Sequence, residues 1–231
     1  MHARRLSLAL LAATGAAALI PATAQGQTRV QDFELGGSAT VLDEQCIRLT
    51  PDQPYVTGSA WFEKPIDLSR PFDMRVSLVL GTKDAEGADG IVFVFHPAMQ
   101  TGFRGEGMGF AGLVPSIGVE FDTYRNLHLA DPESDHLAIM RNGERHHAAP
   151  PLPLGNLEDG QRHPLRIAWA PERGLEIQLD GKSVALYPSE LVARTFGSTP
   201  VVYWGVTAGT GRLSNAQDVC IDQVLVGAVY P

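Results

Sequence analysis

The chain has 231 residues, of which 44% are hydrophobic, and its formal net charge at pH 7 is −8. Nucleic acids and anionic membrane surfaces attract basic proteins, so this acidic balance argues against both kinds of partner. The partners expected for such a chain are neutral ligands or cations.

The first residues predict an export signal. Arg4 and Arg5 precede an apolar run over 6–20, and Ala22-Thr23-Ala24 has the small residues typical of a cleavage site. The run is too short for a spanning helix, and no later apolar stretch could cross a bilayer. We expect a signal peptide over residues 1–24 and a protein secreted to the periplasm or the extracellular space. The alternative is a buried N-terminal helix.

Residues 25–231 are expected to form one domain. Roughly 207 residues suit a larger all-β domain with a sizeable core. Without the signal, which holds two arginines and no acid, the formal charge is −10. Cys46 and Cys220 lie near the two ends of this segment, and a disulfide between them would close a loop of about 175 residues if the terminal strands are neighbours. Two buried free thiols are the alternative.

Apolar segments of strand length recur along the chain, separated by Gly, Pro, Asp and Asn. They are 72–80, 90–97, 116–124, 136–143, 164–170, 174–181, 201–209 and 219–230. A hairpin is predicted at 171–174, and Asp180-Gly181 supplies a second tight turn. Helical periodicity is confined to 189–196, with Ser189 as a candidate N-cap. The pattern predicts an all-β fold, an antiparallel β-sandwich or jelly roll.

The segment 118–136 is unusually rich in carboxylates. Glu120 and Asp122 lie two residues apart on a predicted strand, so they share one face, while Val119 and Phe121 point into apolar packing. Two adjacent carboxylates repel unless a cation binds them or one takes a proton. Tyr124 continues the same alternation toward the following loop.

Two cation sites are compatible with these residues. Asp122, Asn126, Asp131 and the backbone carbonyl of Tyr124 offer the oxygen ligands that Ca²⁺ prefers. With Glu120 and His136 added, the set also suits Mn²⁺ or a similar divalent transition metal. On residue type alone, a polar strand edge with a solvated loop is an equally good interpretation.

The spacing E-x-D-x-Y-x-N-x4-D-x4-H resembles the metal-binding loop of the legume-type (L-type) lectins. The matching residues are Glu120, Asp122, Tyr124, Asn126, Asp131 and His136. The resemblance implies a concanavalin-like jelly roll. It also implies that Glu120, Asp122, Asp131 and His136 hold the transition metal, while Asp122, the Tyr124 carbonyl, Asn126 and Asp131 hold calcium.

Other segments resemble the same family in the same order, over roughly 29–230. The stretch 88–97 is similar to its A-D-G strand, 105–112 to its Gly-rich loop, 203–211 to the turn before its last strand, and 58–68 to its early edge strand. The resemblance implies a cis peptide between Ala88 and Asp89. It further implies a carbohydrate site with Asp89 as acceptor, the N–H of Glu106 or Gly107 and the Asn126 amide as donors, and the Tyr124 ring as platform.

These features predict a secreted, metal-dependent and non-catalytic lectin for neutral saccharides, with a homodimer through a sheet face as a further expectation. Asp135 and Glu106 add negative charge beside the site, which disfavours anionic glycans. His146 and His147 offer a further metal contact, but such loop pairs are more typical of solvated positions.

Two other functions fit the same fold. A retaining glycoside hydrolase needs a second carboxylate near Glu120, where the sequence has Tyr124 and Arg125. A structural or adhesion module without sugar affinity is the other alternative.

Overall fold

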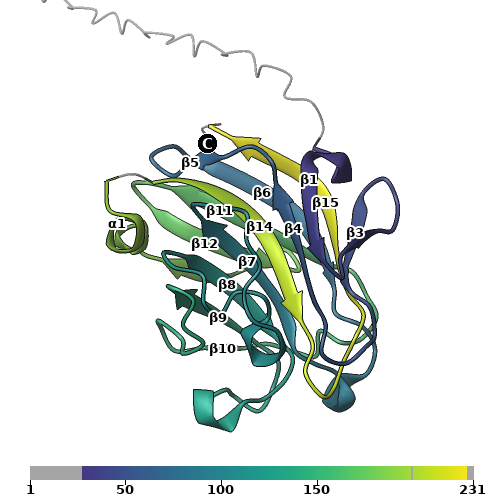
Figure 1. Cartoon of the computed structure of the whole chain (residues 1–231). Coiled ribbons are helices and arrows are strands. Elements are labelled where there is room, and N and C mark those ends of the chain that lie inside the picture. The colour runs from purple at the N-terminus through teal and green to yellow at the C-terminus, as the bar shows by residue number, and fades with distance from the viewer. Residues whose placement is uncertain (1–27, 199, 228–231) are drawn as a thin grey trace, which may run out of the picture.

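The computed structural model describes residues 28–198 and 200–227, and it contains two antiparallel sheets packed face to face (Figure 1). The predicted signal peptide over residues 1–24 lies outside the described residues. The arrangement confirms the predicted jelly-roll β-sandwich. Among the described residues, no helix has the length and hydrophobicity needed to span a bilayer.

The first sheet carries the candidate site. In spatial order its strands are β1 (Phe33–Gly37), β4 (Thr57–Phe62), β14 (Val201–Gly209), β7 (Gly90–His96), β8 (Ile117–Asp122), β9 (His136–Arg141) and β10 (Leu152–Pro153), with β5 (Ile66–Asp67) paired to β14. The segment 58–68 was expected at the edge of a sheet. This expectation is wrong for β4, because β1 pairs with its outer side.

The second sheet forms the opposite layer. Its strands are β13 (Lys182–Tyr187), β12 (Gly174–Leu179), β11 (His163–Ala170), β6 (Phe72–Val79), β15 (Gln217–Val226), β3 (Cys46–Thr50) and β2 (Thr40–Val41). Asp180 and Gly181 both have positive φ, 50° and 75°, in the tight turn between β12 and β13. This is the backbone that a two-residue hairpin turn of the primed type requires, so the Asp-Gly prediction is confirmed.

Short helices complete the structure: η1 (Val30–Asp32), η2 (Asp84–Glu86), η3 (Gly105–Gly107), η4 (Leu127–Leu129) and α1 (Glu190–Phe196). The predicted helix at 189–196 corresponds to α1. Ser189 occupies its N-cap position, but its side chain makes no capping hydrogen bond.

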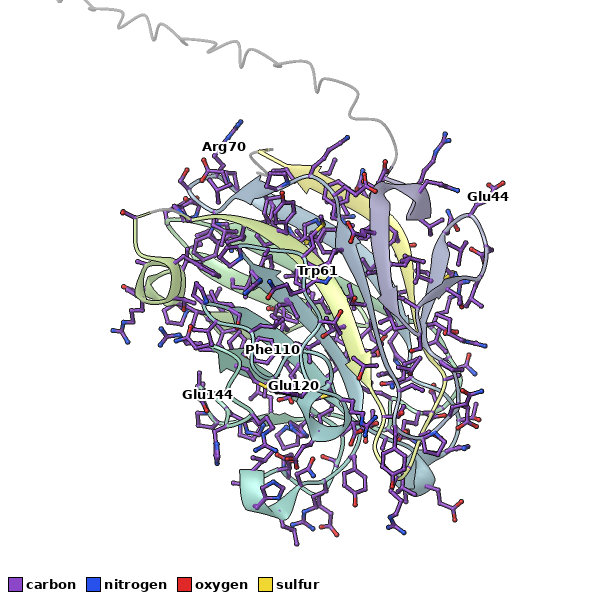
Figure 2. All side chains as sticks on the ribbon, viewed as in Figure 1. Glu44, Trp61, Arg70, Phe110, Glu120 and Glu144 are labelled. Atoms are coloured by element: carbon purple, nitrogen blue, oxygen red, sulfur yellow. A yellow bond between two sulfur atoms is a disulfide. The ribbon has the colours of Figure 1, made fainter. Side chains whose placement is uncertain are left out.

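The main core lies between the sheets. On β7, Ile91, Phe93 and Phe95 point into it, and Val119 and Phe121 of β8 join them, as the alternation predicts. The opposite face of the first sheet is also covered. There Val92 and Val94 pack with Trp61, Met108 and Phe110 beneath the loop that contains η3 (Figure 2). The polar residues of β8 therefore lie on a face that is largely closed to solvent.

Cys46 and Cys220 are joined by a disulfide across the β3–β15 ladder. The two cysteines are direct cross-strand partners, with their Cα atoms 4.0 Å apart and 174 positions between them in sequence. The terminal strands are thus neighbours, which confirms the bridge and excludes the free-thiol alternative.

Candidate functional site

The site is built on the ends of two neighbouring strands. In the ladder between β8 and β9, Asp122 pairs with His136 and Glu120 pairs with Ala138. Residues opposite each other in a ladder point to the same face, so Glu120, Asp122 and His136 converge outside the main core. All three are buried, with 2%, 2% and 1% of their surface exposed.

The loop after β8 is folded back by its own carboxylates. Asp122 Oδ1 accepts a hydrogen bond from the Tyr124 N–H at 2.6 Å, and Asp131 Oδ2 accepts one from the Asn126 N–H at 2.6 Å. Ala130 has a left-handed backbone, with φ 66°, after η4. The turn returns the chain so that Asp131 reaches the residues on β8 and β9.

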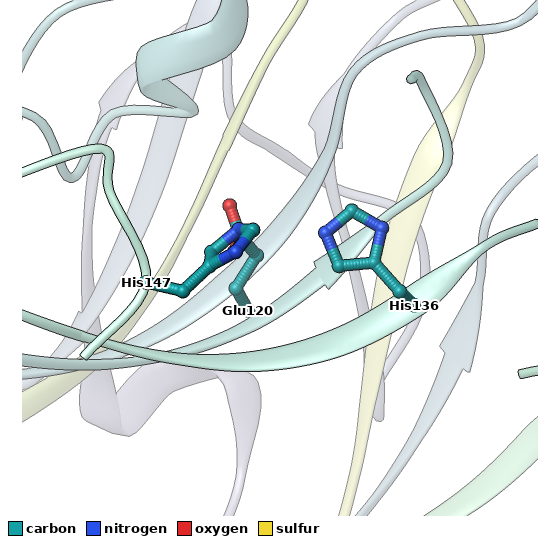
Figure 3. A group of neighbouring side chains, drawn as sticks. All are labelled: Glu120, His136 and His147. Carbon is teal, nitrogen blue, oxygen red and sulfur yellow. The ribbon is translucent and has the colours of Figure 1, made fainter. Parts of the chain in front are cut away.

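His147 joins this group from a loop beyond β9. Its Nε2 atom lies 3.3 Å from Glu120 Oε2, and Figure 3 shows these two side chains with His136. The same Nε2 atom lies 3.5 Å from Asp131 Oδ1, and His136 Nε2 lies 3.8 Å from Asp131 Oδ1. His146, the neighbouring residue, is exposed. The interpretation of both histidines as solvated is therefore wrong for His147. The sequence offered both histidines as a further metal contact but could not choose His147, because no local periodicity links a loop position to β8.

Burial dominates the electrostatics of the group. It raises the pKa of Glu120, Asp122 and Asp131, and repulsion from neighbouring carboxylates adds to the shift of Glu120 and Asp122. Burial, with a contribution from His147, lowers the pKa of His136 to about 4. The Glu120 carboxylate raises the pKa of His147. Without a cation, burial therefore favours protonated carboxyls and a neutral His136 in this group.

Unpartnered atoms test whether a metal ion fits here. Glu120 Oε2, Asp131 Oδ1, His136 Nε2 and His147 Nε2 are all buried without a hydrogen-bond partner. An unsatisfied buried polar atom is costly and rare, and here four of them point at one another. The ligand atoms of Glu120, His136 and His147 lie within 4.8 Å of one another, and so do those of Asp122, Asp131 and His136. The residues present fit a divalent cation.

The predicted calcium ligands lie on the loop side of the same group. Asn126 Oδ1 is another buried atom without a partner, and the Asn126 N–H is held by Asp131. Tyr124 is partly exposed. Asp122, Asn126 and Asp131 carry the oxygen atoms that a hard cation prefers, and their role as calcium ligands stays a prediction.

Asp89 lies beside this loop, at the start of β7. The Ala88–Asp89 peptide is cis, as predicted. The Asp89 N–H donates to Gly209 O at 3.1 Å, and the Asp89 carbonyl accepts from the Thr123 N–H at 2.9 Å. A Cβ on Gly90 would lie 2.2 Å from Phe121 O, so only glycine can follow Asp89 in this position.

The Asp89 carboxyl is available for a ligand. Its Oδ2 atom is buried and has no partner, and the residue is 4% exposed. Burial raises the pKa of Asp89 to about 7, and the Gly211 N–H offsets part of that shift. A fixed acceptor beside the end of β8 and the Gly-rich loop is the arrangement that hydroxyl-bearing ligands require.

Glu106 of the Gly-rich loop contacts the same region. Its Oε2 accepts a hydrogen bond from Asn126 Nδ2 at 3.3 Å and lies 3.0 Å from His128 Nε2, and its Oε1 pairs with Arg145. The Gly107 N–H already donates to Arg104 O at 3.3 Å. Of the two predicted backbone donors, Glu106 is the better candidate.

The structure gives Asp135 a local structural role. Its Oδ2 accepts a hydrogen bond from the Leu157 N–H at 2.6 Å, and its carbonyl accepts from the Leu154 N–H at 2.7 Å. Asp135 therefore organises the segment after β10. The expectation that its carboxylate adds negative charge beside the site stays a prediction.

Tyr55 and Arg104 lie near Asp89 and were not predicted from the sequence. The Tyr55 N–H donates to Gly211 O at 3.0 Å, and the Arg104 guanidinium lies over the Tyr55 ring, 5.5 Å from its centre. Tyr55 remains 54% exposed. It is an ordered aromatic surface beside Gly211, and so near Asp89.

A family model described as the legume lectin beta-barrel domain matches residues 24–223. The chain is 36% identical over 97 residues to pesticidal crystal protein Cry22Aa of Bacillus thuringiensis. It is 31% identical over 125 residues to the probable L-type lectin-domain containing receptor kinase I.5 of Arabidopsis thaliana. These matches cover 41% and 48% of this chain but 13% and 18% of the two relatives. The chain thus corresponds to a small part of each.

Solved structures share the fold. The lectin from Bauhinia forficata in complex with GalNAc has a TM-score of 0.70 and 19% identity, covering 84% of this chain and 91% of that one. The exoplasmic/lumenal domain of VIP36 in its Ca²⁺/Man-bound form has a TM-score of 0.65 and 21% identity, covering 87% and 84%. At these identities the likeness establishes the fold alone.

Proposed function

The chain belongs to the legume lectin β-barrel domain family, and on this premise we propose that it is a metal-dependent lectin that binds neutral saccharides without catalysis. The main support for the proposal is the environment of the Asp89 carboxylate. This carboxylate is buried, held at a cis peptide, unpartnered at Oδ2 and adjacent to the cation ligands. A buried acceptor without a partner is costly unless a ligand satisfies it.

Each sugar-facing role has a candidate residue. Asp89 accepts from sugar hydroxyls, the Asn126 amide and the Glu106 N–H donate, and the Tyr124 ring offers an apolar surface to the sugar's C–H face. The exposed ring of Tyr55, beside Gly211, offers a second aromatic surface.

The cations are proposed to order the loops. Glu120, Asp122, Asp131 and His136 would hold the transition metal, and Asp122, Asn126, Asp131 and the Tyr124 carbonyl would hold calcium. Bound cations supply the positive charge that the buried carboxylates lack. Because Asn126 and Asp131 lie on the loop that faces the sugar, their fixation reduces the ordering cost of binding.

The test is a glycan array followed by calorimetry, with Ca²⁺ and after EDTA, on the wild type and Asp89→Asn. Asp84→Asn is the matched control, because Asp84 is exposed five positions earlier and its φ of 46° is one that asparagine tolerates. We expect glycan binding that EDTA and Asp89→Asn abolish and Asp84→Asn preserves. Binding that survives both treatments would refute the proposal.

The same samples separate the alternatives. A glycoside hydrolase would release reducing ends from polysaccharide, and Glu120→Gln would stop that release. A metal-loaded protein that binds no glycan on the array would instead be a structural or adhesion module. The Glu120 carboxylate is buried against His147, which supports a role as a metal ligand over a catalytic role.

Secretion and dimerisation remain predictions. The Cys46–Cys220 disulfide supports an oxidising compartment, periplasmic or extracellular. N-terminal sequencing of the exported protein tests whether it begins at Gln25. Light scattering tests the homodimer through a sheet face.

A further inference from the structure

The family resemblance assigns four residues to the transition metal and none to His147, yet His147 occupies the same group. Its side chain is 6% exposed, and those of Glu120, Asp131 and His136 are 3%, 0% and 2% exposed. The rings of His136 and His147 meet at 71° with their centres 5.3 Å apart. Both Nε2 atoms lack a hydrogen-bond partner.

The loop that carries His147 is anchored on both sides. Asn142 and Gly143 turn the chain after β9 with φ of 55° and 66°, and Gly143 O accepts from the Gly112 N–H at 3.0 Å. Directly after His147, the Ala148 N–H donates to Ile139 O at 2.7 Å. Backbone hydrogen bonds before and after His147 therefore fix the position of its imidazole in the group.

His147 Nε2 and Glu120 Oε2 lie at ion-pair distance, but their geometry is not that of a hydrogen bond. Within a metal-free pair, a histidinium N–H would donate directly to Glu120. The 3.3 Å approach of His147 Nε2 to Glu120 Oε2 instead leaves both atoms without a hydrogen bond. Two imidazole nitrogens and two carboxylate oxygens that face one another without bonding are what a shared cation would join.

We propose that His147 is a direct ligand of the transition metal, which makes this a two-histidine site suited to zinc and similar borderline ions more than to manganese. Imidazole favours Zn²⁺, Co²⁺, Ni²⁺ and Cu²⁺, whereas Mn²⁺ is better served by carboxylate and water. A second nitrogen ligand shifts the preference in that direction. This inference rests on the metal site of the proposed function and adds both a ligand and a metal class.

The first test counts imidazoles in the wild-type protein. The chelated protein is loaded with Cu²⁺ at one equivalent in the presence of saturating Ca²⁺, and pulsed electron paramagnetic resonance measures the coordinated ring nitrogens. Two imidazoles are expected. A single imidazole would overturn the proposal without reference to any variant, so a folding defect cannot obscure the result.

The second test uses neighbouring histidines as a matched pair. His147→Ala is compared with His146→Ala, whose side chain is exposed. Calorimetric titration with Zn²⁺ alone and Mn²⁺ alone gives both affinities for each protein. We expect His147→Ala to weaken zinc binding by at least about tenfold, since loss of even an outer-shell partner has that effect, and to weaken manganese binding less. Equal affinities in the two variants would overturn it.

Glycan binding on the same samples keeps the two proposals apart. Two imidazoles and a zinc-selective loss without glycan binding would leave His147 as a ligand and refute the lectin. A single coordinated imidazole together with calcium-dependent glycan binding would support the lectin and refute His147 as a ligand.

Discussion

The side-chain amide of Asn126 donates a hydrogen bond to Glu106 Oε2 at 3.3 Å. The amide proposed to meet a sugar hydroxyl is thus held by a carboxylate of the same chain. An amide nitrogen carries two N–H donors, so a glycan must displace this contact only to use the N–H that Glu106 holds.

Glu106→Ala should therefore strengthen glycan binding. Without this competing acceptor, the Asn126 N–H can form its hydrogen bond with the glycan instead. One hydrogen bond contributes roughly 0.5–1.5 kcal/mol, or about twofold to tenfold in affinity. Calorimetry with a glycan identified on the array measures the change. Glu44→Ala, at an exposed position between β2 and β3, should leave affinity unchanged. Weaker binding by Glu106→Ala would instead mean that this carboxylate contacts the sugar.

Chelation should lower the melting temperature. Ligand at one hundred times its Kd stabilises a protein by about 2.7 kcal/mol, which for a domain of this size corresponds to roughly 5–10 °C. Differential scanning calorimetry before and after EDTA measures the shift, and Ca²⁺ with Zn²⁺ should restore it. An unchanged melt would argue against occupied cation sites.

The pH dependence of stability should change sign on chelation. In the metal-free chain, burial raises the pKa of Glu120, Asp122 and Asp131, so the folded state binds more protons than the unfolded state. Its stability should fall as pH rises above the ordinary carboxyl range. The loaded protein should behave oppositely, because protons compete with the metals. Melting curves from pH 4 to pH 8 with and without EDTA compare the two slopes, and slopes of the same sign would contradict this account.

Glu158 lies outside the proposed cation site and adds its own pH dependence to the stability of the protein. Burial raises its pKa to about 7, and Asn215 Nδ2 donates to its Oε1 at 2.7 Å while Oε2 lacks a partner. Since its folded pKa is raised, Glu158 should destabilise the protein increasingly as pH rises from its ordinary value through 7.

Glu158→Gln keeps the Oε1 acceptor and removes the charge. It should stabilise the protein at pH 8 by about 1–3 kcal/mol, the cost of an unsatisfied buried group, and change little at pH 4. Chemical denaturation at both pH values measures the difference. Glu86→Gln, an exposed residue of η2, is the control. Equal effects of Glu158→Gln at the two pH values would contradict the raised pKa.

The disulfide should contribute strongly to stability. A bridge that closes 174 positions restricts the unfolded chain, and removal of a native disulfide costs about 2–5 kcal/mol. The double variant Cys46→Ser and Cys220→Ser should show this loss in guanidinium titrations. Reductant should destabilise the wild type and leave the variant unaffected; a variant as stable as the oxidised wild type would refute the expectation.

Local patterns predicted much of the fold and part of the site. Apolar runs of strand length between turn residues, several of them alternating with period two, identified β6, β7, β8, β9, β11, β12, β14 and β15. The alternation also identified the shared face of Glu120 and Asp122. The Asp180-Gly181 turn was equally local, since its backbone is set by two residues.

Contacts between distant segments accounted for the rest. His147 reaches Glu120 from 27 positions away in sequence, Asp135 turns to Leu157, and Glu106 meets Asn126 from another loop. The pairing of Cys46 with Cys220 likewise required β3 and β15 to be neighbours. Loop conformations depend on what the loops pack against, so neither spacing nor composition specifies them. Strand alternation and motif spacing thus predict a carboxylate-rich loop on a β-sandwich, whereas packing between loops sets how many imidazoles join that group and which contacts the Asn126 amide makes.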